Sequence, residues 1–381
     1  MRVLVTSTPG VGHVLPLVAL ATALRSAGHH VVWATGPDAQ DLVRGAGFES
    51  VTAGTDQASR AQRFRDGWPD VGRLAPRQRR AVAFPALFAT LSAELMYDDL
   101  STVLEDRPVD LIVHEPCELA AAPIAARLGI AQATVGFGRF VPDHLLDGAA
   151  DDVAGLWEMA GRAVPADLGL YSGAYFHPLP SSLEPVRADR PIHLLRPIGD
   201  DTAPRAEADR RGRRPSLYVT FGTEFGPAAP WRSVIDAIGQ LDLDALVTVG
   251  KLVDPDSFGS LPDGVRVERW VPQRDALAAS DLVVSHGGSG AMIGALAAGL
   301  AHLAIPLGAD HFENADLIVE HGIGTIVETP DPSPTEIAER VVALLADDDT
   351  MARSRQAAAE LVAMPSPTSA VALLEHLVDS N

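Results

Sequence analysis

The sequence is poor in cysteine, lysine and aromatic residues, and it has a large deficit of positive charge. Cys117 is the only cysteine among 381 residues, so the chain cannot form an intramolecular disulfide, and nothing in it indicates an oxidising compartment. Lys251 is the only lysine, and the formal net charge is −20. Such a charge repels nucleic acid and anionic membrane surfaces, which excludes both as expected partners.

Long apolar runs are also lacking. Residues 1–5 lead directly into an expected strand, with neither the apolar stretch of a signal peptide nor the length of a membrane span, so a cytoplasmic location is expected. What is present is typical of a globular protein, because 47% of the residues are hydrophobic and only 21% are charged. The length fits two domains.

The first half of the chain repeats a strand–turn–helix pattern. Residues 3–5 form a β-branched run, residues 8–13 a glycine-rich turn, and residues 14–27 an apolar helical periodicity. The pattern recurs at residues 111–113, with a helix expected at 119–128. Strands that alternate with helices predict a parallel, doubly wound α/β sheet.

A polar, arginine- and proline-rich stretch separates this half from a second one that has the same pattern. Its expected strands cover residues 217–223, 245–249, 265–268, 282–285, 303–306 and 326–328. We therefore expect a first domain at residues 1–200, a linker at 201–215 and a second domain at 216–364. A helix at 365–381 would return to the first domain. Loops beyond the carboxyl ends of both sheets would line a cleft between the domains.

Three segments of the second half carry the strongest motif, at residues 270–273, 285–290 and 306–315. The middle one reads Ser-His-Gly-Gly-Ser-Gly between an expected strand and helix, where amide groups can hold a diphosphate. A glycine turn alone also serves other nucleotide binders. Together the three segments resemble the donor-binding signature of nucleotide-sugar glycosyltransferases of the GT-B fold, in the branch that modifies natural products.

The resemblance implies roles in donor binding. Trp270 would pack near the nucleobase, Thr223 would bond a phosphate, His286 would add a hydrogen-bond donor or a positive charge, and Asp310 would bind sugar hydroxyls. Alternatively, Trp270 would fill a hydrophobic core, and Thr223 would be an ordinary turn residue without a ligand. His311 stands where relatives often carry glutamine. The full set is Thr223, Trp270, Val271, Gln273, His286, Gly287, Gly288, Ser289, Gly290, Asp310 and His311.

The resemblance also implies a catalytic pair in the first half. His13 lies in the turn where the family places the histidine that deprotonates the acceptor hydroxyl, and imidazole exchanges its proton near neutral pH. Glu115 occupies the slot in which relatives carry the aspartate that orients this base. Such a pair implies a single displacement with inversion and without a metal. Gly12 and Phe137 are expected to contact the acceptor, although aromatic residues of this region are also compatible with core packing.

The sequence thus indicates an inverting, metal-independent glycosyltransferase that needs no cofactor beyond its nucleotide-sugar co-substrate. Gly294 aligns with a position where relatives that use uridine donors often carry a glutamate that binds the ribose hydroxyls, and its absence favours a thymidine diphosphate donor. Close packing of the helix is an equally good reason for this glycine. The acceptor would be a hydrophobic small molecule. The sequence is also compatible with a homodimer. Two alternatives remain: a nucleotide-sugar epimerase on the same scaffold, and a catalytically silent relative that binds a nucleotide sugar or a partner protein.

Overall fold

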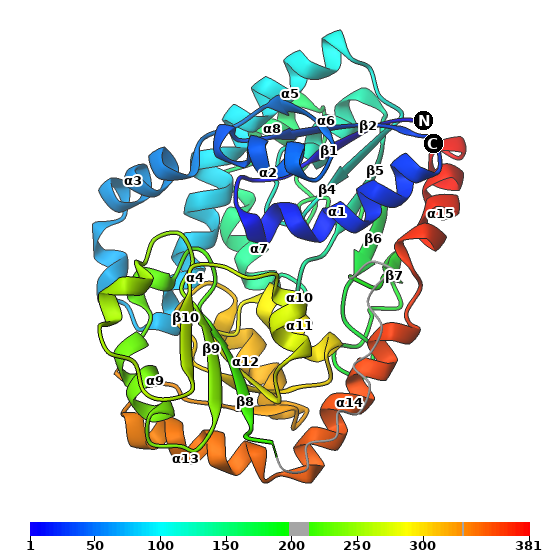
Figure 1. Ribbon diagram of the computed structural model, residues 1–381. Helices are drawn as coiled ribbons and strands as arrows, with labels where there is room; N and C mark the ends of the chain where they lie inside the picture. Colours follow the sequence, from blue (N-terminus) through cyan, green and yellow to red (C-terminus); the bar gives the residue numbers. More distant parts are fainter. Residues whose placement is uncertain (198–212, 330) are drawn as a thin grey trace. The chain divides into compact units, whose positions relative to one another are not determined.

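The computed structural model describes residues 1–197, 213–329 and 331–381. These residues form two compact units (Figure 1). The first comprises Met1–Ser181, Pro185–Asp200 and Pro365–Asn381, and the second comprises Ser182–Glu184 and Asp201–Met364. Most of the expected linker, residues 201–212, lies outside the described residues.

The first unit contains a parallel seven-stranded sheet in the order β3-β2-β1-β4-β5-β6-β7. Its strands are β1 (Arg2–Thr6), β2 (His30–Thr35), β3 (Glu49–Thr52), β4 (Leu111–His114), β5 (Ala131–Val135), β6 (Ala174–His177) and β7 (Ile192–Leu194). Its α-helices are α1 (Val11–Ser26), α2 (Gln40–Gly45), α3 (Gln57–Gly67), α4 (Pro76–Phe84), α5 (Glu94–Asp106), α6 (Ala121–Leu128), α7 (Asp143–Ala150), α8 (Ala154–Met159) and α15 (Pro367–Asp379). A π-helical stretch, Pro85–Ala93, joins α4 to α5.

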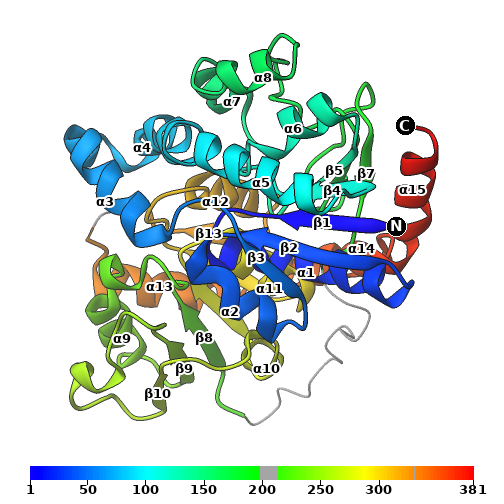
Figure 2. The same ribbon diagram turned by 90° about the horizontal axis from the view of Figure 1, so that it is seen from above.

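Alternate residues of β1 point to opposite faces of this sheet, as the pleat requires. Val3 and Val5 pack with helices α1, α2 and α15, whereas Leu4 packs with α5, α6 and α8 (Figure 2). Since both faces are covered, the central strands read as continuous apolar runs.

The second unit contains a parallel six-stranded sheet in the order β10-β9-β8-β11-β12-β13. Its strands are β8 (Ser216–Thr220), β9 (Asp244–Thr248), β10 (Val265–Glu268), β11 (Leu282–Ser285), β12 (Ala301–Ala304) and β13 (Gly324–Ile326). Its α-helices are α9 (Trp231–Ile238), α10 (Gln273–Ala278), α11 (Ser289–Ala297), α12 (His311–Glu320), α13 (Pro334–Leu345) and α14 (Asp348–Ala363). Helices α9 and α13 cover one face, and α10 and α11 cover the other.

The last two strands begin two residues earlier than their apolar runs predicted. Gly324 was expected to precede β13, but it lies within the strand and pairs with His302 of β12. A Cβ atom at Gly324 would be 2.0 Å from the His302 carbonyl oxygen. Glycine here therefore allows a close approach of two backbones and does not mark a turn.

No single helix of the described ranges is long and apolar enough to cross a membrane. Helices α14 and α15 meet the criterion only as a pair that is bent by 44°.

Candidate active site

The strand order reverses near the centre of each sheet, and the predicted site residues follow the strands at these points. In the first unit the switch lies between β1 and β4, which precede His13 and Glu115 respectively. In the second unit it lies between β8 and β11, which precede Thr223 and His286. Open parallel sheets bind ligands outside the carboxyl ends of their strands at such points. Each unit thus carries a candidate ligand site of its own.

The β1–α1 turn places His13 in the first turn of α1. Gly10 precedes this helix with a φ of 134°, a conformation that side chains strongly disfavour, so glycine is needed there. The His13 amide donates to the Gly10 carbonyl oxygen over 3.1 Å. Gly12 is exposed, and a Cβ at this position would meet nothing within 4 Å among the described residues. The turn therefore leaves open space beside Gly12 while it fixes the histidine.

His13 and Glu115 lie in direct contact. The Nδ1 atom of His13 is 3.2 Å from the Oε1 atom of Glu115. Nδ1 is buried and has no well-aligned hydrogen bond, so the pair is a close electrostatic contact and not a straight N–H···O bond. The His13 side chain keeps 21% of its surface exposed, whereas Glu115 is fully buried. Only the histidine can meet a ligand from solvent.

Backbone and hydroxyl donors hold the Glu115 carboxylate in place. Its Oε1 atom accepts from the Thr8 amide at 3.2 Å and from the Thr8 hydroxyl at 2.9 Å, and its Oε2 atom accepts from the Cys117 amide at 2.5 Å. Burial by itself would raise the pKa of Glu115, but the facing His13 and these hydrogen bonds outweigh it, so the pKa is lowered. The carboxylate is therefore ionised at neutral pH and fixed beside the imidazole.

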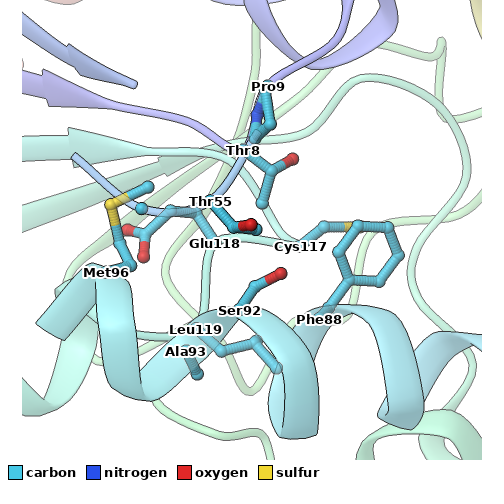
Figure 3. A pocket seen from close by; sticks show the side chains of 11 residues that line it. Thr8, Pro9, Thr55, Phe88, Ser92, Ala93, Met96, Cys117, Glu118 and Leu119 are labelled. Atoms are coloured by element: carbon cyan, nitrogen blue, oxygen red, sulfur yellow. The ribbon is translucent and has the colours of Figure 1, made fainter. Parts of the chain in front are cut away.

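Aromatic side chains surround the exposed edge of His13. Phe88 and Phe137 meet its ring edge to face, with centroid distances of 5.6 and 5.3 Å. Next to them lies a pocket into which Thr8, Ser92, Cys117 and Phe88 project (Figure 3). Phe137 was predicted as an acceptor contact. Phe88 and Ser92 belong to residues 55–96, whose irregular periodicity is compatible with either a pocket lining or core packing and does not single out individual residues.

Glu118 also lines this pocket, but its surroundings differ from those of Glu115. Burial raises its pKa to about 8, against the hydrogen bonds that it accepts from the amides of Ala120 and Ala121 at the start of α6. Two carboxyl groups three residues apart therefore hold opposite protonation states at neutral pH. Glu118 holds the start of α6, and Glu115 faces the histidine.

In the second unit, His286 fills a space that two glycines create. A Cβ atom would lie 2.9 Å from its Nε2 atom at Gly222 and 2.4 Å from it at Gly288. Burial lowers the pKa of His286 to about 4, partly opposed by the nearby Asp310. The ring is therefore neutral at pH 7. Of the two roles that the sequence left open, a hydrogen bond to the ligand stays a prediction, whereas a positive charge does not agree with the lowered pKa.

Asn314 of α12 ties the glycine turn to Asp310. Its Nδ2 atom donates to the Gly287 carbonyl oxygen at 2.9 Å, to the Ser289 hydroxyl at 3.2 Å and to Asp310 Oδ2 at 2.9 Å. Ser289 also donates to Asp310 Oδ2, at 2.5 Å. The motif segments 285–290 and 306–315 thus form one hydrogen-bonded unit. Asn314 was part of the recognised motif, but only the fold reveals this role.

His311 stabilises the loop before α12. Its side chain is 2% exposed, and its Nδ1 atom accepts from the amides of Leu307 and Gly308 at 3.3 and 3.2 Å. These bonds fix the loop that presents the half-buried Asp310. A role of His311 in sugar selection stays a prediction.

The remaining residues that were predicted to bind the donor follow the carboxyl ends of β8 and β10. Trp270 is 71% exposed, so it does not fill a core and offers a free ring face. Val271 packs against the cluster around Tyr218, and Thr223 is half-buried. The Gln273 side chain lies against Gly294, where a Cβ atom would be 3.1 Å from Gln273 Nε2.

One cluster in the described part of the chain has the geometry of a metal site. It combines the side chains of His13, Glu115 and Cys117, whose ligand atoms all lie within 4.8 Å of one another. The Asp-x-Asp pairs at residues 242–244 and 254–256 are not part of it.

Comparison with known proteins shows the family. Residues 232–377 match the family model of the erythromycin biosynthesis protein CIII-like C-terminal domain. The L-demethylnoviosyl transferase of Streptomyces niveus is 30% identical over 388 residues, which cover 96% of each chain. The elloramycin glycosyltransferase ElmGT of Streptomyces olivaceus is 31% identical over 397 residues, which cover 98% of this chain and 97% of that one.

The fold agrees with this result. The glycosyltransferase SsfS6 of Streptomyces sp. SF2575, complexed with thymidine diphosphate, has a TM-score of 0.77 at 22% identity, covering 99% of both chains. The expected fold class is confirmed, and so is the enzyme class. Since the similarity extends over nearly the whole chain, the protein belongs to the antibiotic-tailoring GT-B glycosyltransferases, which transfer sugars from nucleotide diphosphates to natural-product aglycones.

Proposed function

We propose that the protein is an inverting, metal-independent glycosyltransferase that moves a sugar, most simply a deoxysugar, from thymidine diphosphate to a hydroxyl of a hydrophobic aglycone. The observation that carries the proposal is the contact of 3.2 Å between His13 and the buried, ionised Glu115, beside the rings of Phe88 and Phe137. A base, its orienting carboxylate and an apolar surface for the acceptor would thereby lie at one sheet edge.

In the proposed mechanism the two imidazole nitrogens of His13 have different tasks. Nδ1 faces Glu115, so in the reactive tautomer it carries the proton, and Nε2 takes the proton of the acceptor hydroxyl. The carboxylate then stabilises the imidazolium that forms. The acceptor oxygen forms a bond to the anomeric carbon as the bond to the diphosphate breaks, and the nucleoside diphosphate leaves with the electron pair. Attack from the face opposite the leaving group inverts the anomeric centre.

The leaving diphosphate would be held without a metal. The glycine turn opens α11, a nine-residue helix whose first amides and positive dipole end suit an anion. Asn314 fixes this turn through the Gly287 carbonyl oxygen. His286 adds a neutral donor, so backbone dipoles and not a cation would meet the developing charge.

Incubation with a panel of nucleotide sugars and aromatic or macrocyclic aglycones, with mass spectrometry of the products, tests the transfer. The anomeric coupling constant of the product, measured by NMR, then tests inversion. Donor turnover without any glycosylated product would favour the epimerase alternative. No turnover across the panel, with binding of the nucleotide retained, would favour the silent relative.

Glu115→Gln is expected to reduce turnover by on the order of 10- to 100-fold, less than loss of the base itself. The amide removes the charge that faces the imidazolium, and its NH₂ group must oppose the amide or hydroxyl donors of Thr8 or the amide of Cys117. The pH–rate profile should change as well, whereas Glu115→Asp, which keeps the charge, should be tolerated. An unaltered rate and profile in a folded Glu115→Gln protein would refute the catalytic pair.

The choice of thymidine is supported by Gly294 and its neighbour. No carboxylate is available at this position for ribose hydroxyls, and Gln273 occupies the adjacent space. A buried 2′-hydroxyl without a partner costs about 1–3 kcal/mol. The related SsfS6 was solved with thymidine diphosphate.

We therefore expect thymidine diphosphate glucose to exceed uridine diphosphate glucose in kcat/KM by roughly 5- to 150-fold, with one acceptor. Gly294→Glu alone would crowd Gln273 and Leu277, because a Cβ atom at residue 294 would lie 3.1 Å from the side chains of both. The informative variant is Gly294→Glu combined with Gln273→Ala, with Gln273→Ala alone as the control. The double variant should shift the ratio of the two kcat/KM values toward uridine diphosphate glucose. A wild-type preference for uridine would reject this donor assignment but not the transferase.

A further inference from the structure

Three side chains of different ligand chemistry meet beyond the carboxyl ends of β1 and β4. They are the imidazole of His13, the carboxylate of Glu115 and the thiol of Cys117, with one ligand atom of each within 4.8 Å of the other two. Of these separations, the one between His13 Nδ1 and Glu115 Oε1 is 3.2 Å. Residues 115 and 117 share one loop, so this grouping follows directly from the β4–α6 connection.

The nitrogen–oxygen separation suits a tetrahedral divalent ion. Zinc bonds to nitrogen and oxygen are about 2.0–2.2 Å long and bonds to sulfur about 2.3 Å, so neighbouring ligand atoms are roughly 3.2–3.8 Å apart. The nitrogen–oxygen pair already meets this requirement. The Cys117 sulfur lies within 4.8 Å of both atoms, so an ion that binds here would draw it closer to them. A set of N, O and S donors favours Zn²⁺ or Cd²⁺ over Mg²⁺.

The surroundings of the cluster also resemble those of a built site. The amides of Thr8 and Cys117 and the Thr8 hydroxyl hold the carboxylate in place, as outer hydrogen bonds do around metal ligands. Nδ1 of His13 is buried without a well-aligned hydrogen bond, so an ion would supply a partner. The partly exposed histidine provides the route of entry.

We propose that His13, Glu115 and Cys117 form an inhibitory site for a zinc-like divalent ion. The thiol proton leaves to solvent as the sulfur–metal bond forms, and the lone pair of Nδ1 binds the ion. The single ring proton then resides on Nε2, which can no longer accept a proton from the acceptor hydroxyl. A water molecule completes the coordination. Binding does not depend on the proposed function, whereas inhibition rests on His13 acting as the base.

Direct binding is measured on full-length, chelator-treated protein with Cd²⁺ and Zn²⁺ as probes. We expect one equivalent of Cd²⁺ to produce ultraviolet thiolate-to-metal absorption, which requires Cys117, the only cysteine. By calorimetry, Zn²⁺ should bind Cys117→Ser and His13→Ala at least about 10- to 100-fold more weakly than wild type. His144→Ala, which changes an exposed histidine of α7, is the matched control and should bind Zn²⁺ like wild type.

Inhibition is measured as the Zn²⁺ concentration that halves each variant's own metal-free rate. We expect Cys117→Ser to need at least about 10-fold more Zn²⁺ than wild type, and excess chelator to restore the rate. Chelator alone should leave the wild-type rate intact, as a metal-independent transfer requires. Absence of the Cd²⁺ absorption, or equal Zn²⁺ affinity of wild type and Cys117→Ser, would overturn the site. Full turnover with the site saturated would instead overturn the inhibition and the role of His13.

Discussion

His13→Ala should lower turnover by about 10²–10⁴-fold while the affinity for the nucleoside diphosphate stays near that of wild type. The imidazole is the proposed proton acceptor, whereas the predicted donor residues belong to the second unit. Glu115 would remain as a buried carboxylate, but it has no exposed surface from which to reach an acceptor hydroxyl. Steady-state kinetics, together with calorimetric titration of the nucleotide, separate the two effects.

His144→Ala serves as the control for this variant as well, because it removes an exposed histidine of the same unit. The melting temperature of both variants should match that of wild type. Added imidazole should partly restore turnover to His13→Ala, since the truncated side chain leaves space between Phe88 and Phe137. A folded His13→Ala protein that retains near-normal turnover would be incompatible with the proposed mechanism.

Mild acid is expected to destabilise the fold by several kcal/mol. Burial lowers the pKa of His114 and His286 to about 4 and that of His177 and His302 to about 3, all from 6.5 in an unfolded chain. Because the unfolded state binds protons first, the stability that these neutral histidines contribute is present above pH 6.5. It is lost as the pH falls toward their pKa values in the folded state. Between pH 6.5 and 5, each histidine lowers the free energy of unfolding by about 2 kcal/mol at most.

Glu118 acts in the opposite direction. Its pKa rises from 4.5 to about 8 on folding, so its unfavourable contribution diminishes as the pH falls from 8 to 4.5. Four histidines outweigh one glutamate, and the net effect is a loss of stability in acid.

Melting curves between pH 8 and 5 test this expectation in wild type and in His302→Gln. The glutamine can still contact the Ser285 hydroxyl, which lies 2.7 Å from His302 Nε2, but it does not titrate. The decrease in melting temperature with acid should therefore be smaller in this variant than in wild type. In the control His144→Gln, which changes an exposed histidine, the decrease should equal that of wild type. A wild-type melting temperature that does not depend on pH over this range would contradict the prediction.

The proximity of His13 and Glu115 could be predicted because neighbouring parallel strands end at one edge of a sheet. Their residues follow β1 and β4, which pair in register from Val3 with Leu111 to Thr6 with His114. The residue types then indicated the chemistry. Cys117 was noted only for the disulfide that it excludes, since its position near this pair depends on the conformation of the β4–α6 loop.

Contacts across several elements could not be read from the sequence. Gly222 and Gly288 are needed because the ring of His286 lies against both, although the sequence favoured ligand approach as the reason for Gly288. Likewise, Asn314 reaches back to Gly287 from a helix that begins after the next strand. Such roles depend on packing between elements, which periodicity and turn residues do not encode.

The end of the chain constrains how this enzyme can be recombined with its relatives. Helix α15 contributes Ala370, Val371 and Leu374 to the core beneath β1 and α1, and Asn381 donates to the Gly129 carbonyl oxygen. A hybrid that exchanges everything after residue 200 would remove this part of the first core and substitute a foreign helix. Under the proposed division of roles, hybrids designed to change the sugar while retaining the acceptor should therefore exchange an internal cassette that stops before Pro365. Residues Met1–Ser181 and Pro365–Asn381 of the first unit then stay together.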